Sequence, residues 1–94
     1  MDAASQELTA ARIAEIVSRV PGVAALDGGM FGEVATYLPH ERILGVRLRD
    51  DGSVDVHVTA YRGVPLPQLA ARIRRALAEN VRIDVTIADI VEPG

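Results

Sequence analysis

Few side chains in this sequence have the type and spacing that metal binding or catalysis requires. His57 is the best placed, because it alternates with Asp55 and Thr59 in a strand-like segment, and a neighbouring strand could add Asp84. A histidine with two carboxylates could bind a divalent metal ion. A solvated sheet face with charge pairs between strands explains the same residues without a ligand. We prefer that interpretation and predict no metal site.

No nucleophile in the sequence has a recognisable catalytic setting. Nucleophilic catalysis needs a nucleophile, a base and a third group that positions them. Ser5 resembles a helix cap, Ser18 lies in a predicted helix and Ser53 lies in a predicted turn. The sequence has no cysteine, which excludes disulfides, cysteine-ligated zinc and thiol catalysis. We therefore predict a protein without enzymatic activity and without a cofactor.

Residues 27–32, Asp-Gly-Gly-Met-Phe-Gly, form a glycine-rich segment that could be a binding loop. A phosphate loop would open a helix, so that its amides face the anion, whereas residues 33–38 have an extended pattern. Gly29 to Gly32 also has the spacing of the G-x-x-G loop of KH domains, but basic flanking helices are missing. A structural turn is the interpretation we prefer. A small KH-like nucleic-acid-binding module is kept as the alternative function.

The charged residues weigh against a nucleic-acid partner. All ten basic residues are arginines, and thirteen acidic residues give a net charge of −3. Three arginines, Arg72, Arg74 and Arg75, lie in one predicted helix. Helical spacing turns Arg74 by roughly 160–200° from Arg72, so these side chains splay and form no dense patch. The sequence also has one Phe, two Tyr and no Trp, which is a poor basis for stacking on nucleotide bases.

Hydrophobic periodicity predicts the elements that carry these residues. Residues 53–61 alternate as a strand, and a Gly/Pro turn leads into a helix over residues 65–80. The turn Asp50-Asp51-Gly52 pairs that strand with one before it, in which Leu44, Val46 and Leu48 should point inward. A first helix is predicted over residues 5–20, with Ser5 as its N-cap. A last strand is predicted over residues 82–90, with Ile83, Val85 and Ile87 inward.

The resulting order is helix, one or two short strands in residues 23–38, hairpin, helix, strand. Both helices need an apolar sheet face, while the other sheet face is polar, so we predict the α+β class. The architecture should be a two-layer α/β sandwich with a mixed sheet and two helices on one face. We expect one domain over residues 1–94, with disorder at residues 1–4 and 92–94.

Several segments of this pattern resemble the alkaline shock protein/general stress protein envelope family, over about residues 12–91. The matching segments are Val20-Pro21-Gly22-Val23, Gly45-Val46-Arg47-Leu48 before Asp51-Gly52, Val54-Asp55-Val56-His57-Val58, Tyr61-Arg62-Gly63-Val64-Pro65-Leu66-Pro67 and Val85-Thr86-Ile87-Ala88-Asp89-Ile90. The tyrosine–x–glycine sequence with its later prolines is the most specific of these.

The resemblance implies a nonenzymatic, cytoplasmic cell-envelope stress protein that forms homo-oligomers. It would reach the membrane through a protein partner, such as a small membrane-anchored protein, and would not insert into the bilayer itself. No apolar run approaches the roughly 18–20 residues that cross a bilayer. Some of the apolar residues that the pattern leaves without an inward position should form the partner surface. They are Leu8, Met30, Phe31, Tyr37, Leu38, Ile43, Ile90 and Val91.

Overall fold

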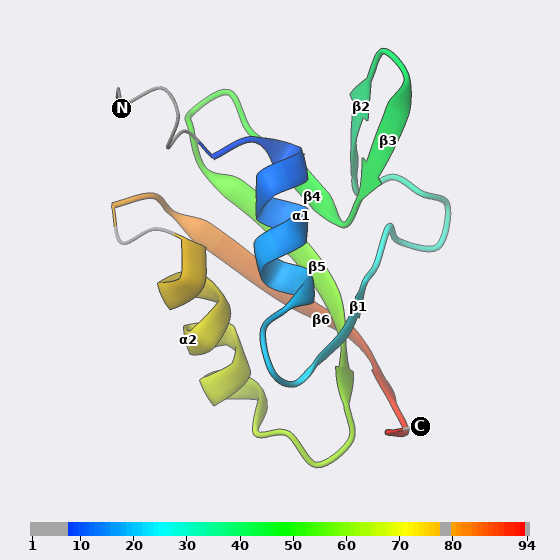
Figure 1. Ribbon diagram of the computed structural model, residues 1–94, viewed down its shortest axis with the longest axis vertical. Helices are drawn as coiled ribbons and strands as arrows, with labels where there is room; N and C mark the ends of the chain where they lie inside the picture. The colour runs from blue at the N-terminus through cyan, green and yellow to red at the C-terminus, as the bar shows by residue number, and fades with distance from the viewer. Residues whose placement is uncertain (1–7, 78–79, 94) are drawn as a thin grey trace.

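Two helices lie on one face of a β-sheet in the computed structural model of this chain, which describes residues 8–77 and 80–93 (Figure 1). The first, α1, spans Ala10–Ser18, and the second, α2, spans Leu66–Leu77. The helices contact one another as well as the sheet. The predicted α+β class, with two helices packed on one apolar sheet face, is confirmed.

The central strand of the sheet is β5 (Val54–Tyr61), the segment with the clearest alternation in the sequence. On one side β6 (Ile83–Val91) runs parallel to it. On the other side β4 (Val46–Leu48) and β1 (Val23–Leu26) run antiparallel to it, one after the other along its length. The sheet is therefore mixed, and the last strand lies beside the second strand of the predicted hairpin.

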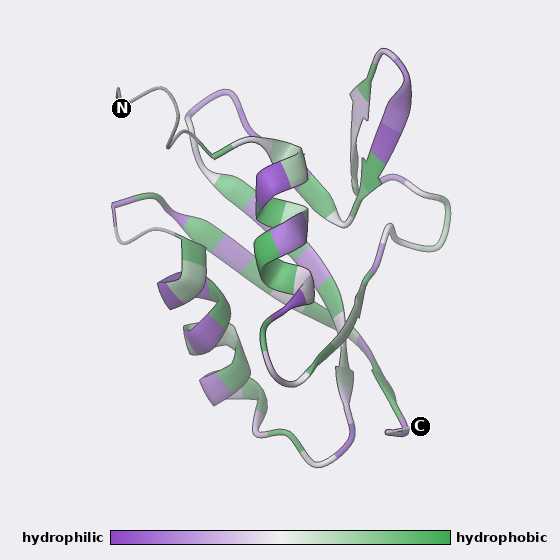
Figure 2. Cartoon of the chain, in the orientation of Figure 1, coloured by the Kyte–Doolittle hydropathy of each residue, from purple (hydrophilic) through white to green (hydrophobic). Residues whose placement is uncertain are grey.

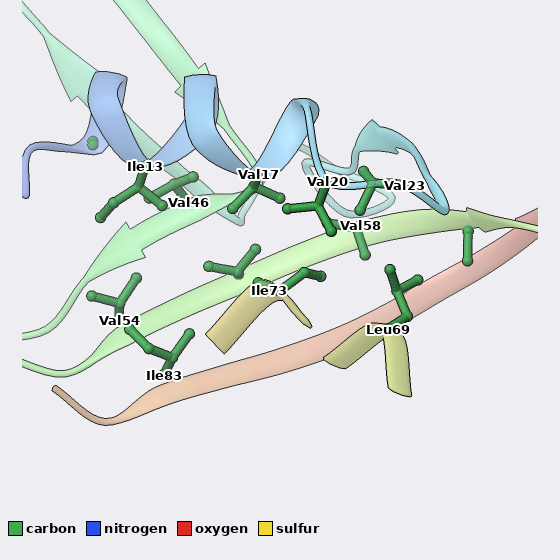
Figure 3. Close-up of a cluster of buried hydrophobic side chains, with 13 residues drawn as sticks. Ile13, Val17, Val20, Val23, Val46, Val54, Val58, Leu69, Ile73 and Ile83 are labelled. Atoms are coloured by element: carbon green, nitrogen blue, oxygen red, sulfur yellow. The ribbon is translucent and has the colours of Figure 1, made fainter. Parts of the chain in front are cut away.

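The hydrophobic core fills the space between the helices and the sheet. Figure 2 shows apolar and polar residues alternating along β5, which gives this strand one apolar face. Figure 3 shows side chains from α1, α2 and the sheet meeting in this layer. The largest fully buried side chains are Ile13, Leu69, Ile73, Val17, Val46, Val56 and Val58. Burial of each such side chain contributes about 1.5–3 kcal/mol, so this layer holds the helices on the sheet.

The first helix begins later than predicted. Thr9 has extended backbone angles, and its side chain accepts a hydrogen bond of 3.1 Å from the Arg12 amide. This arrangement caps the helix and satisfies one of the free amides of its first turn. Ser5, the predicted cap, lies outside the described residues. Leu8, which the helical pattern placed on the polar face, is instead half-buried against the core.

The strand predicted across residues 44–49 is broken at Gly45. This glycine has a φ of +81°, and its carbonyl accepts a hydrogen bond of 2.9 Å from the His57 amide. The chain turns sharply there, because a positive φ is accessible to glycine at little cost. The residues before the break form β3 (Glu41–Leu44), which pairs with β2 (Ala35–Leu38) in a separate hairpin.

Disorder was predicted at residues 1–4 and 92–94, and the structure describes only residues 92 and 93 of these. Residues 1–4 and residue 94 lie outside the described residues. Glu92 forms an ion pair with Arg62, just beyond the end of β5. The disorder stays a prediction.

Candidate partner-binding surface

An arm formed by residues 28–44 leaves the sheet between β1 and β4 (Figure 1). It consists of the glycine-rich loop and the β2–β3 hairpin. The Asp27 amide donates to the His57 carbonyl at 2.8 Å, and the Gly45 carbonyl accepts from the His57 amide at 2.9 Å. Both ends of the arm are thus fixed to the backbone of one residue of the central strand.

Hydrogen bonds from side chains hold the glycine-rich loop in shape. The Asp27 carboxylate accepts from the Gly29 amide at 2.7 Å, and the Glu33 carboxylate accepts from the Phe31 amide at 2.9 Å. The amides of Glu33 and Phe31 hold the pKa of the Glu33 carboxyl below its ordinary value. Carboxylates of this chain therefore occupy amides that a phosphate-binding loop would offer to its ligand. The loop also leads into β2 and not into a helix.

Four of the apolar residues predicted for the partner surface are exposed on the arm. Met30 and Phe31 at the loop are each 87% exposed, Tyr37 is 68% exposed and Leu38 is 39% exposed. The Tyr37 hydroxyl donates to the Gly32 carbonyl at 3.4 Å, which brings the hairpin close to the loop. Large apolar side chains exposed on the surface are typical of sites where another molecule binds.

The other residues predicted for the partner surface are less exposed. Leu8, Ile43 and Ile90 are half-buried and pack against the core from three different parts of the chain. Val91, at the end of β6, is 36% exposed. The structure therefore places Met30 and Phe31 on the loop of the arm and Tyr37 and Leu38 on its hairpin, all four exposed. Ile43, also on the hairpin, is instead half-buried against the core.

Leu44 belongs to the arm as well, although the strand pattern placed it inward. It is 37% exposed, and its side chain covers Gly28, where an added Cβ would lie 2.8 Å from a Leu44 methyl carbon. Leu48, also predicted to point inward, is 43% exposed. The sequence signal for this correction is Gly45, since an isolated glycine inside a strand pattern often marks a bend or a close approach.

The polar face of the sheet contains a buried carboxylate, whereas a solvated face with charge pairs was predicted. Asp55 is only 6% exposed. Its carboxylate lies 3.2 Å from a guanidinium nitrogen of Arg49, 3.6 Å from one of Arg47 and 3.2 Å from Nε2 of His57. Long arginine side chains from β4 and the loop that follows it reach this carboxylate and cover it, which alternation alone cannot predict.

Asp84, on the neighbouring β6, pairs with arginines and not with His57. Its carboxylate accepts from Arg49 at 2.8 Å and from Arg82 at 3.2 Å, and these bonds hold its pKa below the ordinary value. Within residues 8–77 and 80–93, no three His, Cys, Asp or Glu side chains are grouped to hold a metal ion. The polar face is a set of neutralised charge pairs.

Two of the α2 arginines bind backbone carbonyls of the same chain. Arg72 donates to the Pro21 carbonyl at 3.1 Å, and Arg74 donates to the Ile83 carbonyl at 3.0 Å. The first contact ties α2 to the turn after α1, and the second ties it to β6. These two side chains therefore have structural partners and do not converge on one patch.

A pocket of about 450 Å³ lies where the β4–β5 turn approaches the end of α2. Among the described residues its lining is mainly leucine and valine, and Arg49, the one ionisable side chain of that lining, already pairs with Asp55 and Asp84. Ser53, also in the lining, donates its hydroxyl hydrogen bond to Asp51 at 2.6 Å. Catalysis needs polar groups that converge on a reacting atom, and the described lining of this pocket does not supply them.

The surface geometry is the main guide to function, because comparisons with known proteins found no match. The chain matches no protein-family model, no curated protein and no solved structure. Of the helices in the described residues, neither α1, with nine residues, nor α2, with twelve, is long enough to cross a bilayer, which takes about 20 residues. The most distinctive surface of the described chain is the arm with its exposed apolar side chains.

Proposed function

We propose that this chain is a noncatalytic cell-envelope stress-response protein that acts through self-association and protein–protein contacts, with the arm as the surface that binds a protein partner. The cell-envelope role comes from the family resemblance of the sequence. The mode of action comes from the arm. The partner we expect is a small membrane-anchored protein, through which a cytoplasmic protein would reach the membrane.

The observation that carries the proposal is the exposure of Met30 and Phe31, each 87% exposed on the loop of the arm. Burying side chains of this size against a partner contributes about 1.5–3 kcal/mol each. The loop backbone is already fixed by the carboxylates of Asp27 and Glu33. A pre-organised loop loses little conformational freedom on binding, which favours affinity.

The KH-like alternative gains no support from the same residues. The loop joins two strands, and the amides of Gly29 and Phe31 donate to carboxylates of the chain itself. Arg72 and Arg74, which would have to contact phosphates, bind backbone carbonyls. We therefore propose no second function.

The test is affinity purification of the tagged chain from its native cells, comparing wild type with a Met30→Ser/Phe31→Ser double variant. A Leu66→Ser variant is the matched control, because Leu66 is also an exposed apolar residue but lies on α2. We expect a membrane protein to co-purify with the wild type and with the control, and to be lost from the double variant. Thermal unfolding should show that all three chains are folded.

Equal capture of the same membrane protein by all three chains would contradict the role of the arm. Absence of any co-purifying protein, together with binding of single-stranded RNA at low salt, would favour the KH-like alternative.

A further inference from the structure

One edge of β6 has no strand partner in the described part of the chain. This strand is nine residues long and pairs only with β5. The Val54 amide donates to the Arg82 carbonyl at 2.9 Å, so alternate residues from Arg82 onward direct their backbone groups toward β5. The residues between them, Ile83, Val85 and Ile87, direct their amides and carbonyls away from the sheet.

The opposite edge of the sheet is better protected. The Val46 carbonyl on β4 accepts a hydrogen bond of 2.7 Å from the Thr36 hydroxyl of the arm, and the pairing of β1 is interrupted by a bulge. On β6, Arg74 covers the carbonyl of Ile83 but does not reach the outward amide and carbonyl of Val85. The pairing of β6 also has a bulge, but only after Ile87, so the outward groups of Val85 and Ile87 lie on an uninterrupted run. Such an open run on an edge strand is a template for pairing with another chain.

We infer that the open edge of β6 pairs antiparallel with the same edge of a second copy of this chain, to form a two-fold symmetric dimer. This inference rests on the self-association in the proposed function and names the surface that produces it. A second copy is the occupant that fits, because in the described residues one edge is open and the other is protected. Like edges then meet in a closed pair, and further copies cannot add.

The length of the regular segment sets the register of this pair. The pairing of β6 with β5 shifts after Ile87 and leaves Ala88 without a partner, so the regular run covers residues 83–87. Its midpoint is Val85, which therefore lies opposite Val85 of the second copy. Ile83 then lies opposite Ile87, and core-facing side chains of one copy meet core-facing side chains of the other.

The charges of β6 are compatible with this register. Asp84 of one copy lies opposite Thr86 of the other, so the two Asp84 carboxylates do not face each other. Arg82 lies opposite Ala88 and therefore beside Asp89, which is on the polar face because it pairs with Thr59. Two opposite-charge neighbours result, one on each side of the symmetry axis.

Sedimentation equilibrium over a range of concentrations tests the dimer. Val85→Pro removes the amide that points away from β5, and proline is tolerated on an edge strand at such a position. The two central hydrogen bonds are lost, which should raise the dimer dissociation constant about 5- to 150-fold.

A pair of opposite charge substitutions at one residue separates dimer contacts from folding. Thr86→Asp places a carboxylate opposite Asp84 of the other copy, once on each side of the symmetry axis. It should raise the dissociation constant about 2- to 30-fold, whereas Thr86→Lys should lower it by a similar factor. In the wild type, the amides of Val85 and Ile87 should exchange hydrogen more slowly as concentration rises.

A wild-type chain that stays monomeric at about 1 mM overturns the inference, as does a dimer that responds to neither Val85→Pro nor the Thr86 pair. The Met30→Ser/Phe31→Ser variant separates the two proposals. It should dimerise like the wild type while losing the membrane partner. A dimer that this variant abolishes, with no protection of the Val85 amide, would place self-association on the arm and not on β6.

Discussion

Replacing Gly45 by alanine should destabilise the chain more than the same replacement at a turn glycine that has open space around it. Gly45 lies at the joint between the arm and the sheet, with a φ of +81°. A Cβ there would be 2.8 Å from the His57 carbonyl oxygen and 2.9 Å from the Cβ of Leu26. Neither contact can be relieved by rotating a flexible side chain, because both involve atoms on or next to the backbone.

The expected cost has two parts. A non-glycine residue in the left-handed region costs about 1–2 kcal/mol. The clash with packed backbone adds about 1–3 kcal/mol, so Gly45→Ala should lower the free energy of unfolding by about 2–5 kcal/mol. Gly52 is the matched control, since its φ is +88° and an added Cβ would have no atom within 4 Å. Gly52→Ala should therefore cost only the conformational part, about 1–2 kcal/mol.

Urea unfolding followed by circular dichroism measures both costs, from the midpoints at an unchanged denaturant slope. A domain of this length has a free energy of unfolding of about 5–14 kcal/mol, so the Gly45 variant should shift its midpoint markedly. Equal midpoints for the two variants would refute the reasoning, because they would show that the close approach at Gly45 has no energetic consequence.

Three further predictions concern the polar face and the first helix. The pKa values of Asp51 and Asp84 lie below the ordinary 3.8, because Ser53 donates hydrogen bonds to the first carboxylate and Arg49 to the second. The two ionised carboxylates therefore stabilise the fold at neutral pH, and this contribution is lost as the pH falls through their folded-state pKa. Thermal unfolding should thus change little from pH 7 to about 5 and shift to lower temperature below about pH 4, with a weaker shift in an Asp84→Asn variant. Asp55→Asn should cost about 1–2 kcal/mol in urea unfolding, less at high salt, because Arg47 and Arg49 are partly exposed and regain water; an unchanged midpoint at low salt would contradict the pairing. Thr9→Ala should cost about 1 kcal/mol through loss of the helix cap, measured as a lower melting temperature, and no change would show that the cap is unimportant.

The parts of the fold that the sequence predicts well are those with sustained periodicity. The alternation in β5 and the helical spacing in α2 are each long enough to exclude other structures, and both elements lie where predicted. The break at Gly45 was harder to predict, because Leu44, Val46 and Leu48 keep an uninterrupted period of two through it. The glycine itself is a weak signal of a bend, and its neighbourhood, which depends on β1 and β5, shows that the chain must turn there.

The candidate surface is predictable in part for the same reason. Met30, Phe31, Tyr37 and Leu38 fit no apolar face of a predicted element, and all four are exposed on the arm. Leu8, Ile43 and Ile90 fit no face either, yet they reach the core from segments distant in sequence. Local pattern identifies residues without an assigned neighbour, but it cannot say whether tertiary packing later supplies one. The coverage of Asp55 by arginines is unpredictable in the same way.

The two proposed surfaces lie on opposite sides of the central strand, and this arrangement has a mechanical consequence. β6 borders one edge of β5, while β4 and the arm border the other. A dimer joined at β6 therefore carries its two arms at its outer ends, free of each other and of the interface.

Such a dimer can engage two membrane-anchored partners at once, and the second contact forms at the high effective concentration that the first one creates. Dimerisation would then strengthen attachment to the membrane without any new contact at the arm. A variant such as Thr86→Asp, with an intact arm and a weakened dimer, should keep its affinity for a single partner in solution and lose retention on a surface where the partner is dense.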